Sequence, residues 1–258
     1  MGIKGLFISF YTIVRKDIVR IIRLWQQTFL PTAITSALYF LIFGAFLGSK
    51  IGNIGDTPYT NFVVPGLVML GVVTNSFSNV ATTFFTSKFF ARNIDEILVS
   101  PTPPLVIIAG FITGGIVRGM AIGVLVILIS LFFTHLTLYN IFIILAFLFL
   151  TSLTFSLAGL VNGVYAKSFD GISIIPTFVL TPLVYLGGVF YSTSSLSDFW
   201  QTVTLFNPVF YIINGFRYGF LGFSDVSIMI SFGVLGGLTV FLFLINLYLL
   251  KKGLGLRQ

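Results

Sequence analysis

The sequence contains no cysteine and few charged residues. The missing cysteines exclude disulfide bonds, thiolate chemistry and cysteine-ligated metal sites. Only 8% of the 258 residues are charged, against roughly a quarter in a soluble domain, while 57% are hydrophobic. A chain of this composition cannot cover a surface that faces water, so we expect it to lie in a membrane. Hydrophobic stretches recur along its whole length, which leaves no room for a soluble catalytic domain.

The sequence also lacks the phosphate-binding loop of ATPases. The nearest approach to the pattern G-x-x-x-x-G-K-[ST] runs from Gly163 to Ser168, and it has Ala166 where the second glycine should stand. We therefore expect no ATP hydrolysis by this chain. No set of nucleophile, base and orienting residue is evident either, so we expect no enzymatic activity and no catalytic residues.

Acidic residues and histidine are scarce as well. On the topology given below, all seven carboxylates fall in loops or interfacial segments: Asp17, Asp56, Asp95, Glu96, Asp170, Asp198 and Asp225. Ion-coupled transporters commonly hold an ionisable group at membrane depth, so the scarcity of such groups weakens the case for a partner-independent secondary transporter or channel, which stays open as an alternative. The single histidine, His135, has no carboxylate nearby in the sequence and gives no support for a metal site.

Six segments contain the roughly 20 apolar residues that a membrane-spanning helix requires. They predict an all-α, polytopic membrane protein in which residues 1–258 form a single transmembrane domain. The predicted spans are residues 24–47, 62–87, 105–134, 139–165, 172–190 and 226–250.

The basic residues are distributed unevenly between the two sides of these spans. If both termini are cytoplasmic, 11 of the 14 lysines and arginines lie on the inner side, only Lys50 and Arg217 lie outside, and Arg118 falls within a span. This bias follows the positive-inside rule and predicts a multi-pass membrane protein with both termini in the cytoplasm. The net charge of +7 then records orientation rather than nucleic-acid binding.

Arg118 lies in a predicted span that is longer than the membrane is thick. Thirty helical residues extend about 45 Å, against roughly 30 Å of hydrocarbon, so this segment must tilt or protrude. If residues 114–133 fill the membrane, Arg118 lies about one turn inside the cytoplasmic edge. Snorkelling to the headgroups is the preferred interpretation, and a gating role is the alternative.

Residues 3–23 predict an amphipathic helix before the first span. Apolar residues recur at helical spacing at Phe7, Tyr11, Val14, Ile18 and Ile21, whereas three basic residues share another face: Lys16, Arg20 and Arg23. The apolar side can enter the headgroup boundary, while the basic side meets either anionic lipid or a cytoplasmic partner.

A second amphipathic helix is predicted at residues 88–100, on the cytoplasmic side. Arg92, Asp95 and Glu96 lie one helical turn apart, beside apolar residues, and the prolines from Pro101 onward end the helix. A plain spacer would require neither the apolar stripe nor the prolines, so the pattern favours a docking element.

Polar residues interrupt the second span at Thr74, Asn75, Ser76, Ser78 and Asn79. Such groups are costly in lipid unless they are hydrogen-bonded, so they should face other helices or water. A transport path and interhelical packing explain them equally well.

Prolines and glycines interrupt the region from the fifth span onward. Pro176 and Pro182 should kink or loosen that helix, which closes on two glycines. The aromatic-rich residues 191–220, with breaks at Asn207-Pro208 and at Gly215, predict short re-entrant or interfacial helices, and an aromatic belt at the outer face is the alternative. Arg217 is expected to pair with Asp198, Asp225 or headgroups.

Several of these segments together resemble the membrane subunits of type-2 ABC exporters over essentially the whole chain. The resemblance rests on the helix at 3–23, the block Arg92-Asn-Ile-Asp-Glu-Ile-Leu-Val-Ser-Pro101, and Asn207-Pro208 followed by Gly215-Phe-Arg217-Tyr-Gly219. The run from Pro176 to Tyr191 and Pro65-Gly66-Leu67 bring it close to the YadH-like bacterial inner-membrane permeases.

The resemblance implies a permease that exports a lipid, glycan or hydrophobic drug-like substrate. Two copies of the chain would pair, with two ATPase subunits that bind ATP and Mg, and no cofactor on this chain. Residues 3–23 would be the connecting helix, 88–100 the coupling helix and 191–220 the outer re-entrant helices. The expected ATPase-docking residues are Arg92, Asn93, Ile94, Asp95, Glu96, Ile97 and Leu98 with Lys16, Arg20 and Arg23. The expected pathway residues are Asn75, Asn79, Tyr185, Tyr191, Phe199, Trp200, Asn207, Pro208 and Arg217.

Overall fold

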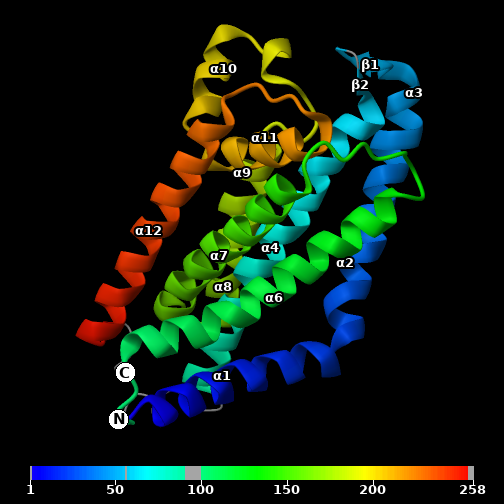
Figure 1. The fold of residues 1–258 in the computed structure, drawn as a ribbon. Coiled ribbons are helices and arrows are strands. Elements are labelled where there is room, and N and C mark those ends of the chain that lie inside the picture. The colour runs from blue at the N-terminus through cyan, green and yellow to red at the C-terminus, as the bar shows by residue number, and fades with distance from the viewer. Residues whose placement is uncertain (1, 56, 91–99, 255–258) are drawn as a thin grey trace.

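The computed structural model describes residues 2–55, 57–90 and 100–254, and these residues form a bundle of helices (Figure 1). The first half of the chain contains α1 (Ile3–Arg23), α2 (Trp25–Tyr39), the π-helix η1 (Phe40–Leu47), α3 (Gly48–Ile51), β1 (Asn53–Ile54), β2 (Thr57–Pro58) and α4 (Tyr59–Phe89). The second half contains α6 (Pro104–Ser130), α7 (Ile141–Tyr165), α8 (Phe169–Ile175), η2 (Pro176–Leu180), α9 (Thr181–Tyr185), η3 (Thr193–Ser195), α10 (Asp198–Leu205), α11 (Pro208–Leu221) and α12 (Ile228–Lys252).

The helix α4 forms the centre of the bundle. It packs against α6, α7 and α11, and 78% of its most apolar window is buried inside the protein. Its polar side chains therefore lie between helices. By contrast, only 18% of the corresponding window is buried in the segment Trp25–Ile51 and only 11% in α12, so these two are the peripheral helices.

The helix α1 lies across one end of the bundle, at the end that holds both termini (Figure 1). The chain turns at Leu24, whose backbone leaves the helical region, and then enters α2. The short helices α10 and α11 and the β1–β2 hairpin lie at the opposite end (Figure 1). One end of the molecule is thus built from an amphipathic helix and the other from short helices and turns.

Five segments of the described chain are long and apolar enough to cross a membrane: Trp25–Ile51, Tyr59–Phe89, Pro104–Ser130, Ile141–Tyr165 and Ile228–Lys252. They correspond to five of the six predicted spans. The remaining predicted span, the fifth along the chain at 172–190, is a shorter apolar helix from Phe169 to Tyr185. It begins beside the end of α4, where Phe169 contacts Phe85, and ends beside α11, where Leu183 accepts a hydrogen bond from Asn207.

The loosening predicted in this fifth segment is a π-helical turn. It begins at Pro176, and the hydroxyl of Thr181 donates to the Pro176 carbonyl at 2.9 Å. Proline withholds a backbone donor, so the ordinary α-helical ladder cannot run through Pro176 and Pro182. A side chain and a wider turn provide the missing hydrogen bonds.

Two details of the prediction need correction. The third span ends at Ser130 rather than at residue 134, where the Ser130 hydroxyl donates to Ile127 and a turn follows. The predicted break at Gly215 is wrong, because α11 runs through this residue, whose missing side chain admits the ring of Phe147. β1 and β2 pair as a hairpin of two residues in each strand, which leaves the all-α fold class unchanged.

The predicted helix at 88–100 falls mainly on residues 91–99, which lie outside the described residues. What the structure does describe is its two flanks. Lys88 donates to the Val164 carbonyl at 3.1 Å at the end of α4, and α6 starts after Pro103 with Pro104 at its first position.

Close contact between α4 and α7 depends on Gly159. A β-carbon at this position would lie 2.3 Å from the backbone oxygen of Phe77, closer than such contacts allow. We predict that Gly159→Ala lowers the free energy of unfolding by about 1–3 kcal/mol, the cost of overpacking a core. SDS-induced unfolding of the purified chain, followed by circular dichroism, measures this.

Gly233→Ala in α12 is the matched control, because a β-carbon there would meet nothing within 4 Å. It should leave stability unchanged or raise it by up to about 1 kcal/mol through helix propensity. Equal effects of the two substitutions would contradict the packing argument.

Candidate functional site

A buried cluster of polar side chains joins α1 to α4 and α6. Its centre is Asp17, which is only 2% exposed although it lies on an amphipathic helix at the end of the bundle. The cluster comprises Asp17, Arg20, Asn75, Asn79, Thr83 and Arg118, and we call it the α1–α4–α6 cluster.

Each oxygen of the Asp17 carboxylate accepts hydrogen bonds. Oδ1 accepts from Arg20 at 2.7 Å and from Thr83 at 3.2 Å, and Oδ2 accepts from Asn79 at 2.9 Å. Arg20 also donates to Asn79 and to the Thr83 hydroxyl. A buried charge is tolerated only when it is paired and hydrogen-bonded, and both conditions hold here.

Glycines on α6 let α1 approach closely enough to bury this carboxylate. A β-carbon at Gly114 would lie 1.7 Å from Oδ2 of Asp17, and one at Gly110 would lie 2.8 Å from Ile13. Ile13 and Asp17 are four residues apart and so share one face of α1. This face fits against a flat strip of α6, while Phe7 and Tyr11 remain exposed.

Arg118 points into the same cluster from α6. Its guanidinium donates to Asn75 at 3.1 Å and to Asn79 at 3.4 Å. The two asparagines are one turn apart on α4 and present their oxygens toward α6. The interpretation of Arg118 as a side chain that snorkels to the headgroups left out these two acceptors within the protein.

Two cavities extend the cluster along α2. One has a volume of about 170 Å³ and is lined by Arg20, Ile21, Leu24, Gln27, Thr28, Asn79 and Arg118. The other has a volume of about 230 Å³ and is lined by Pro31, Thr32, Thr35, Ser36, Tyr39, Leu67, Leu70, Gly71, Thr74 and Asn75. Asn75 links them because it accepts from Arg118 and donates to Thr32 at 3.4 Å. We use the name polar seam for the polar side chains that line these two cavities, from Arg20 at one end to Tyr39 at the other.

The polar seam ends at a cluster of aromatic rings. The hydroxyls of Tyr39 and Tyr185 are hydrogen-bonded at 2.8 Å, which connects α2 to α9. Phe43 stacks on Phe190 with ring centroids 4.1 Å apart, and Tyr59 donates to the Phe190 carbonyl at 3.1 Å. Of the predicted pathway residues, Asn75, Asn79 and Tyr185 thus lie along one continuous feature.

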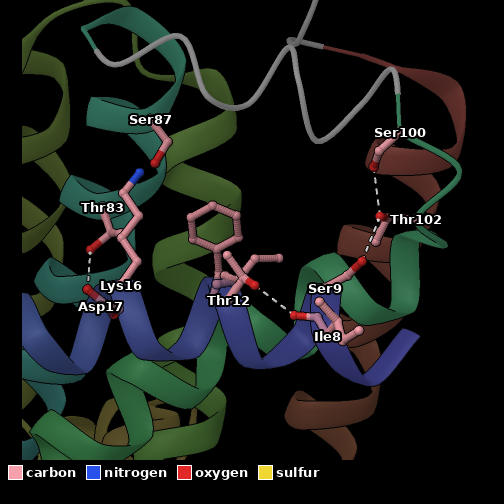
Figure 2. A pocket seen from close by; sticks show the side chains of 11 residues that line it. Ile8, Ser9, Thr12, Lys16, Asp17, Thr83, Ser87, Ser100 and Thr102 are labelled. Carbon is pink, nitrogen blue, oxygen red and sulfur yellow. Dashed lines mark hydrogen bonds between the residues drawn. The ribbon is translucent and has the colours of Figure 1, made fainter. Parts of the chain in front are cut away.

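A larger cavity, of about 390 Å³, lies beside α1 at its junction with α4 and residues 100–102 (Figure 2). Figure 2 shows Lys16 reaching from α1 toward Ser87 on α4, and Asp17 bonded to Thr83. On the other side of the cavity, Thr102 bonds to Ser100 and donates to Ser9. Hydroxyl groups therefore hold α1 against both ends of the segment that contains the predicted docking helix.

Among the basic residues predicted to dock an ATPase, the structure separates Arg20 from the other two. Lys16 and Arg23 are exposed on α1. Arg20 instead turns inward to Asp17, so it does not lie on an open docking face. The remaining predicted docking residues, Arg92 to Leu98, lie outside the described residues.

The other predicted pathway residues gather at the opposite end of the bundle, away from the polar seam. Asn207 caps α11 by accepting from Val209, and Pro208 takes the first helical position. Tyr191 donates to Leu186, and burial raises the pKa of its hydroxyl, so it acts there as a neutral donor. The aromatic side chains of α10 are open, with Phe199 67% and Trp200 48% exposed.

Arg217 forms no salt bridge with Asp198 or Asp225, two of the partners expected for it, although the charge of Asp225 acts on it. It is only 1% exposed, donates to the Gly188 carbonyl at 2.6 Å, and lies over the ring of Phe62 at 3.8 Å from its centroid. Asp225 instead accepts from Ser192 and from the backbone of Thr193. Arg217 therefore ties α11 to the turn after α9 and to the start of α4.

The sequence interpretation missed Asp17 and Thr83 as members of the buried cluster. Both stand at positions that helical spacing would align: Thr83 is one turn beyond Asn79, and Asp17 is three residues before Arg20. The available signal was Asp17 itself, a single acidic residue among basic ones on an amphipathic helix. The described residues contain no group of three or more histidine, aspartate or glutamate side chains that could hold a metal ion.

Comparison with known proteins assigns the chain to a family. A family model described as ABC-2 type transporter matches residues 8–221, the region from α1 to α11. The chain belongs to the ABC-2 type transporter family. Inner membrane transport permease YadH of Escherichia coli strain K12 is 51% identical to this ABC-2 protein over 98% of each chain.

More distant relatives cover nearly as much of the ABC-2 protein. Nodulation protein J of Rhizobium leguminosarum bv. viciae is 25% identical over 84% of each chain. The protein of the same name from Neorhizobium galegae is 23% identical over 90% of this chain and 93% of its own. The ABC-2 protein is thus a transport permease rather than an enzyme, and its family implies an ABC ATPase as partner.

The buried carboxylate of this ABC-2 protein can be tested directly. Asp17→Ala removes the one described carboxylate bonded to Arg20 and leaves that charge unpaired. We predict a loss of about 3 kcal/mol in the free energy of unfolding, the low end for a broken buried pair because Arg20 remains 33% exposed. SDS-induced unfolding measures the loss.

Asp170→Ala is the control, because Asp170 is exposed in the first turn of α8. Its loss should not exceed about 1 kcal/mol, the value of a carboxylate near a helix amino terminus. A loss as small as this in Asp17→Ala would show that the α1–α4–α6 cluster contributes little to stability.

Proposed function

We propose that two copies of this ABC-2 permease form the membrane part of an ATP-driven exporter, with ATP and Mg bound on separate ATPase subunits. The substrate class is a lipid, glycan or hydrophobic drug-like amphiphile. The observation that carries the proposal is the polar seam, which runs along α2, one of the least covered helices of the chain.

The location of the polar seam argues for a second copy of the chain. Gln27 and Thr35 are exposed on α2, and Thr32 and Asn75 are only half-buried. Polar groups of a membrane protein are stable when they face protein or water rather than lipid. A second copy placed against the α2 face would enclose the two seams as a polar path between them.

The course of the chain supports six crossings. The segment α8–η2–α9 connects the end that holds the termini to the end that holds α11 (Figure 1). Its 17 helical residues would extend about 26 Å, slightly less than the roughly 30 Å of a typical hydrocarbon core. With it, both termini lie on one side, which the distribution of basic residues makes the cytoplasm. The name of the E. coli relative YadH supports the inner membrane.

The helix α1 has the position required of a connecting helix. It lies across the end of the bundle with the termini, and its buried face is bonded to α4 through Asp17 and Arg20. The adjacent residues 88–100 would form the coupling helix that enters the ATPase. Movement of either element would reach α4 directly. This coupling exists only if the two transport states differ in these contacts.

The topology can be tested with single cysteines, because the natural chain has none. Asp198→Cys and Asp170→Cys are a matched pair, since both residues are exposed in the first turn of a short helix. We predict that a membrane-impermeant maleimide labels Asp198→Cys in spheroplasts and labels Asp170→Cys only after permeabilisation. Labelling of both in intact spheroplasts would contradict the six-span topology.

The docking role can be tested with the triple substitution Arg92→Ala, Asp95→Ala and Glu96→Ala. We predict that the variant reaches the membrane in normal amounts but no longer co-purifies with an ATPase subunit, so that the eluate loses its ATPase activity. Removing these charges removes the polar contacts that we propose between the coupling helix and the ATPase. Pull-down from native membranes, mass spectrometry and an ATPase assay provide the measurement.

The matched control is Lys251→Ala with Lys252→Ala, which removes exposed charges at the end of α12 near the carboxyl terminus. It should retain the partner. If the triple variant retained a full complement of ATPase, docking at residues 92–96 would be ruled out. A wild-type chain that moves a substrate under an ion gradient alone would instead favour a secondary transporter.

A further inference from the structure

The cavity of about 170 Å³ at the turn between α1 and α2 contains an excess of positive charge. We propose that it binds the phosphate headgroup of an anionic amphiphile. We further propose that this amphiphile is the transported substrate, bound at the end of the polar seam, and this part rests on the proposed function. The existence of the binding site does not depend on the proposed function.

Hydrogen-bond donors dominate the polar part of the cavity lining. Arg20, Arg118, Asn79, Gln27 and Thr28 each present a guanidinium, amide or hydroxyl group. No carboxylate is among the described residues that line it. A lining of this kind favours an anion, because guanidinium groups bind phosphate oxygens through paired, charge-assisted hydrogen bonds.

The charges around the cavity do not balance within the described part of the chain. Two guanidinium groups, Arg20 and Arg118, stand against one carboxylate, Asp17. Both Asp17 oxygens already accept from Arg20, Asn79 and Thr83. Arg118 donates to the neutral amide oxygens of Asn75 and Asn79, and its buried Nε has no partner among the described residues. One positive charge is therefore left without a counter-ion.

An uncompensated charge at this depth is costly. A buried ion requires a partner of opposite charge or a strong set of hydrogen bonds. Neutral amides meet part of this requirement for Arg118, and an anion in the cavity would meet the rest. It would also offset the repulsion between Arg118 and Arg20, which both donate to the side-chain oxygen of Asn79.

The size and position of the cavity select a headgroup rather than a whole lipid. A volume of about 170 Å³ is several times the roughly 30 Å³ that one water occupies, which suits a phosphate group. Ile21 and Leu24 provide an apolar side. Trp25, the next residue, is 54% exposed, as is common for tryptophan at the membrane interface. The acyl chains of an amphiphile would thus remain in the membrane beside α2.

Two sources could provide the same chemistry, namely a lipid headgroup and free phosphate, and Trp25 can distinguish them. The chain has two tryptophans, so Trp200→Phe leaves Trp25 as a single reporter beside the cavity. The full chain with this background substitution is reconstituted into phosphatidylcholine vesicles. Brominated phosphatidylglycerol or brominated phosphatidylcholine is then added, and quenching of Trp25 fluorescence is measured.

We predict saturable quenching in which phosphatidylglycerol is preferred over phosphatidylcholine by about tenfold, which corresponds to about 1.4 kcal/mol. Arg118→Gln should abolish the preference, while Arg118→Lys, which keeps the charge, should retain part of it. Arg15→Gln is the control, because it removes the same charge from an exposed position on α1 and should keep the preference.

Competition then identifies the source of the anion. If inorganic phosphate at millimolar concentration releases phosphatidylglycerol, the site recognises phosphate itself; if it does not, the site requires a lipid headgroup. Equal quenching by both lipids in the parent, or an equal loss in Arg15→Gln and Arg118→Gln, would overturn the proposal. The assay needs neither ATP nor transport, so its failure would leave the proposed exporter function untouched.

Discussion

The structure depends on one constraint, which is that polar groups inside a membrane protein must find partners within the protein. The hydrogen bonds that Asp17 accepts from Arg20 and Asn79 satisfy it where α1 meets the bundle. Because the carboxylate is buried, α1 is fixed in position and orientation along α4 and α6. An amphipathic helix held only by lipid would be free to slide over the end of the bundle. Here it is bonded to the central helix.

The hydrophobic pattern predicted most of the fold, because a bilayer imposes a minimum length on every span. The helix predicted at 3–23 has the same bounds as α1, Ile3–Arg23. The wider turn at Pro176 could be predicted because proline lacks a backbone donor. By contrast, Gly215 was misread as a break, because a glycine required for packing against Phe147 looks the same in sequence as one that ends a helix.

The candidate site was less predictable, because it depends on contacts between distant parts of the chain. Asn75 and Asn79 stood out as polar residues in a span, but their partner Arg118 is about 40 residues away, and hydropathy alone placed its charge at the membrane surface. Asp17 meets Asn79 across 62 positions. Gly110 and Gly114 permit this contact, but the sequence does not show which helix packs against them.

The π-helical turns η1 and η2 have a consequence for how the bundle can change shape. An α-helix has 3.6 residues per turn, so each residue turns the chain by about 100°. A π-helical turn accommodates about one extra residue. If η2 tightened to an α-helix, Tyr185 would therefore rotate by roughly 100° about the helix axis, with little bending of the backbone. The hydroxyl bond between Tyr185 and Tyr39 would break, so α2 and α9 would separate by a change of helical register.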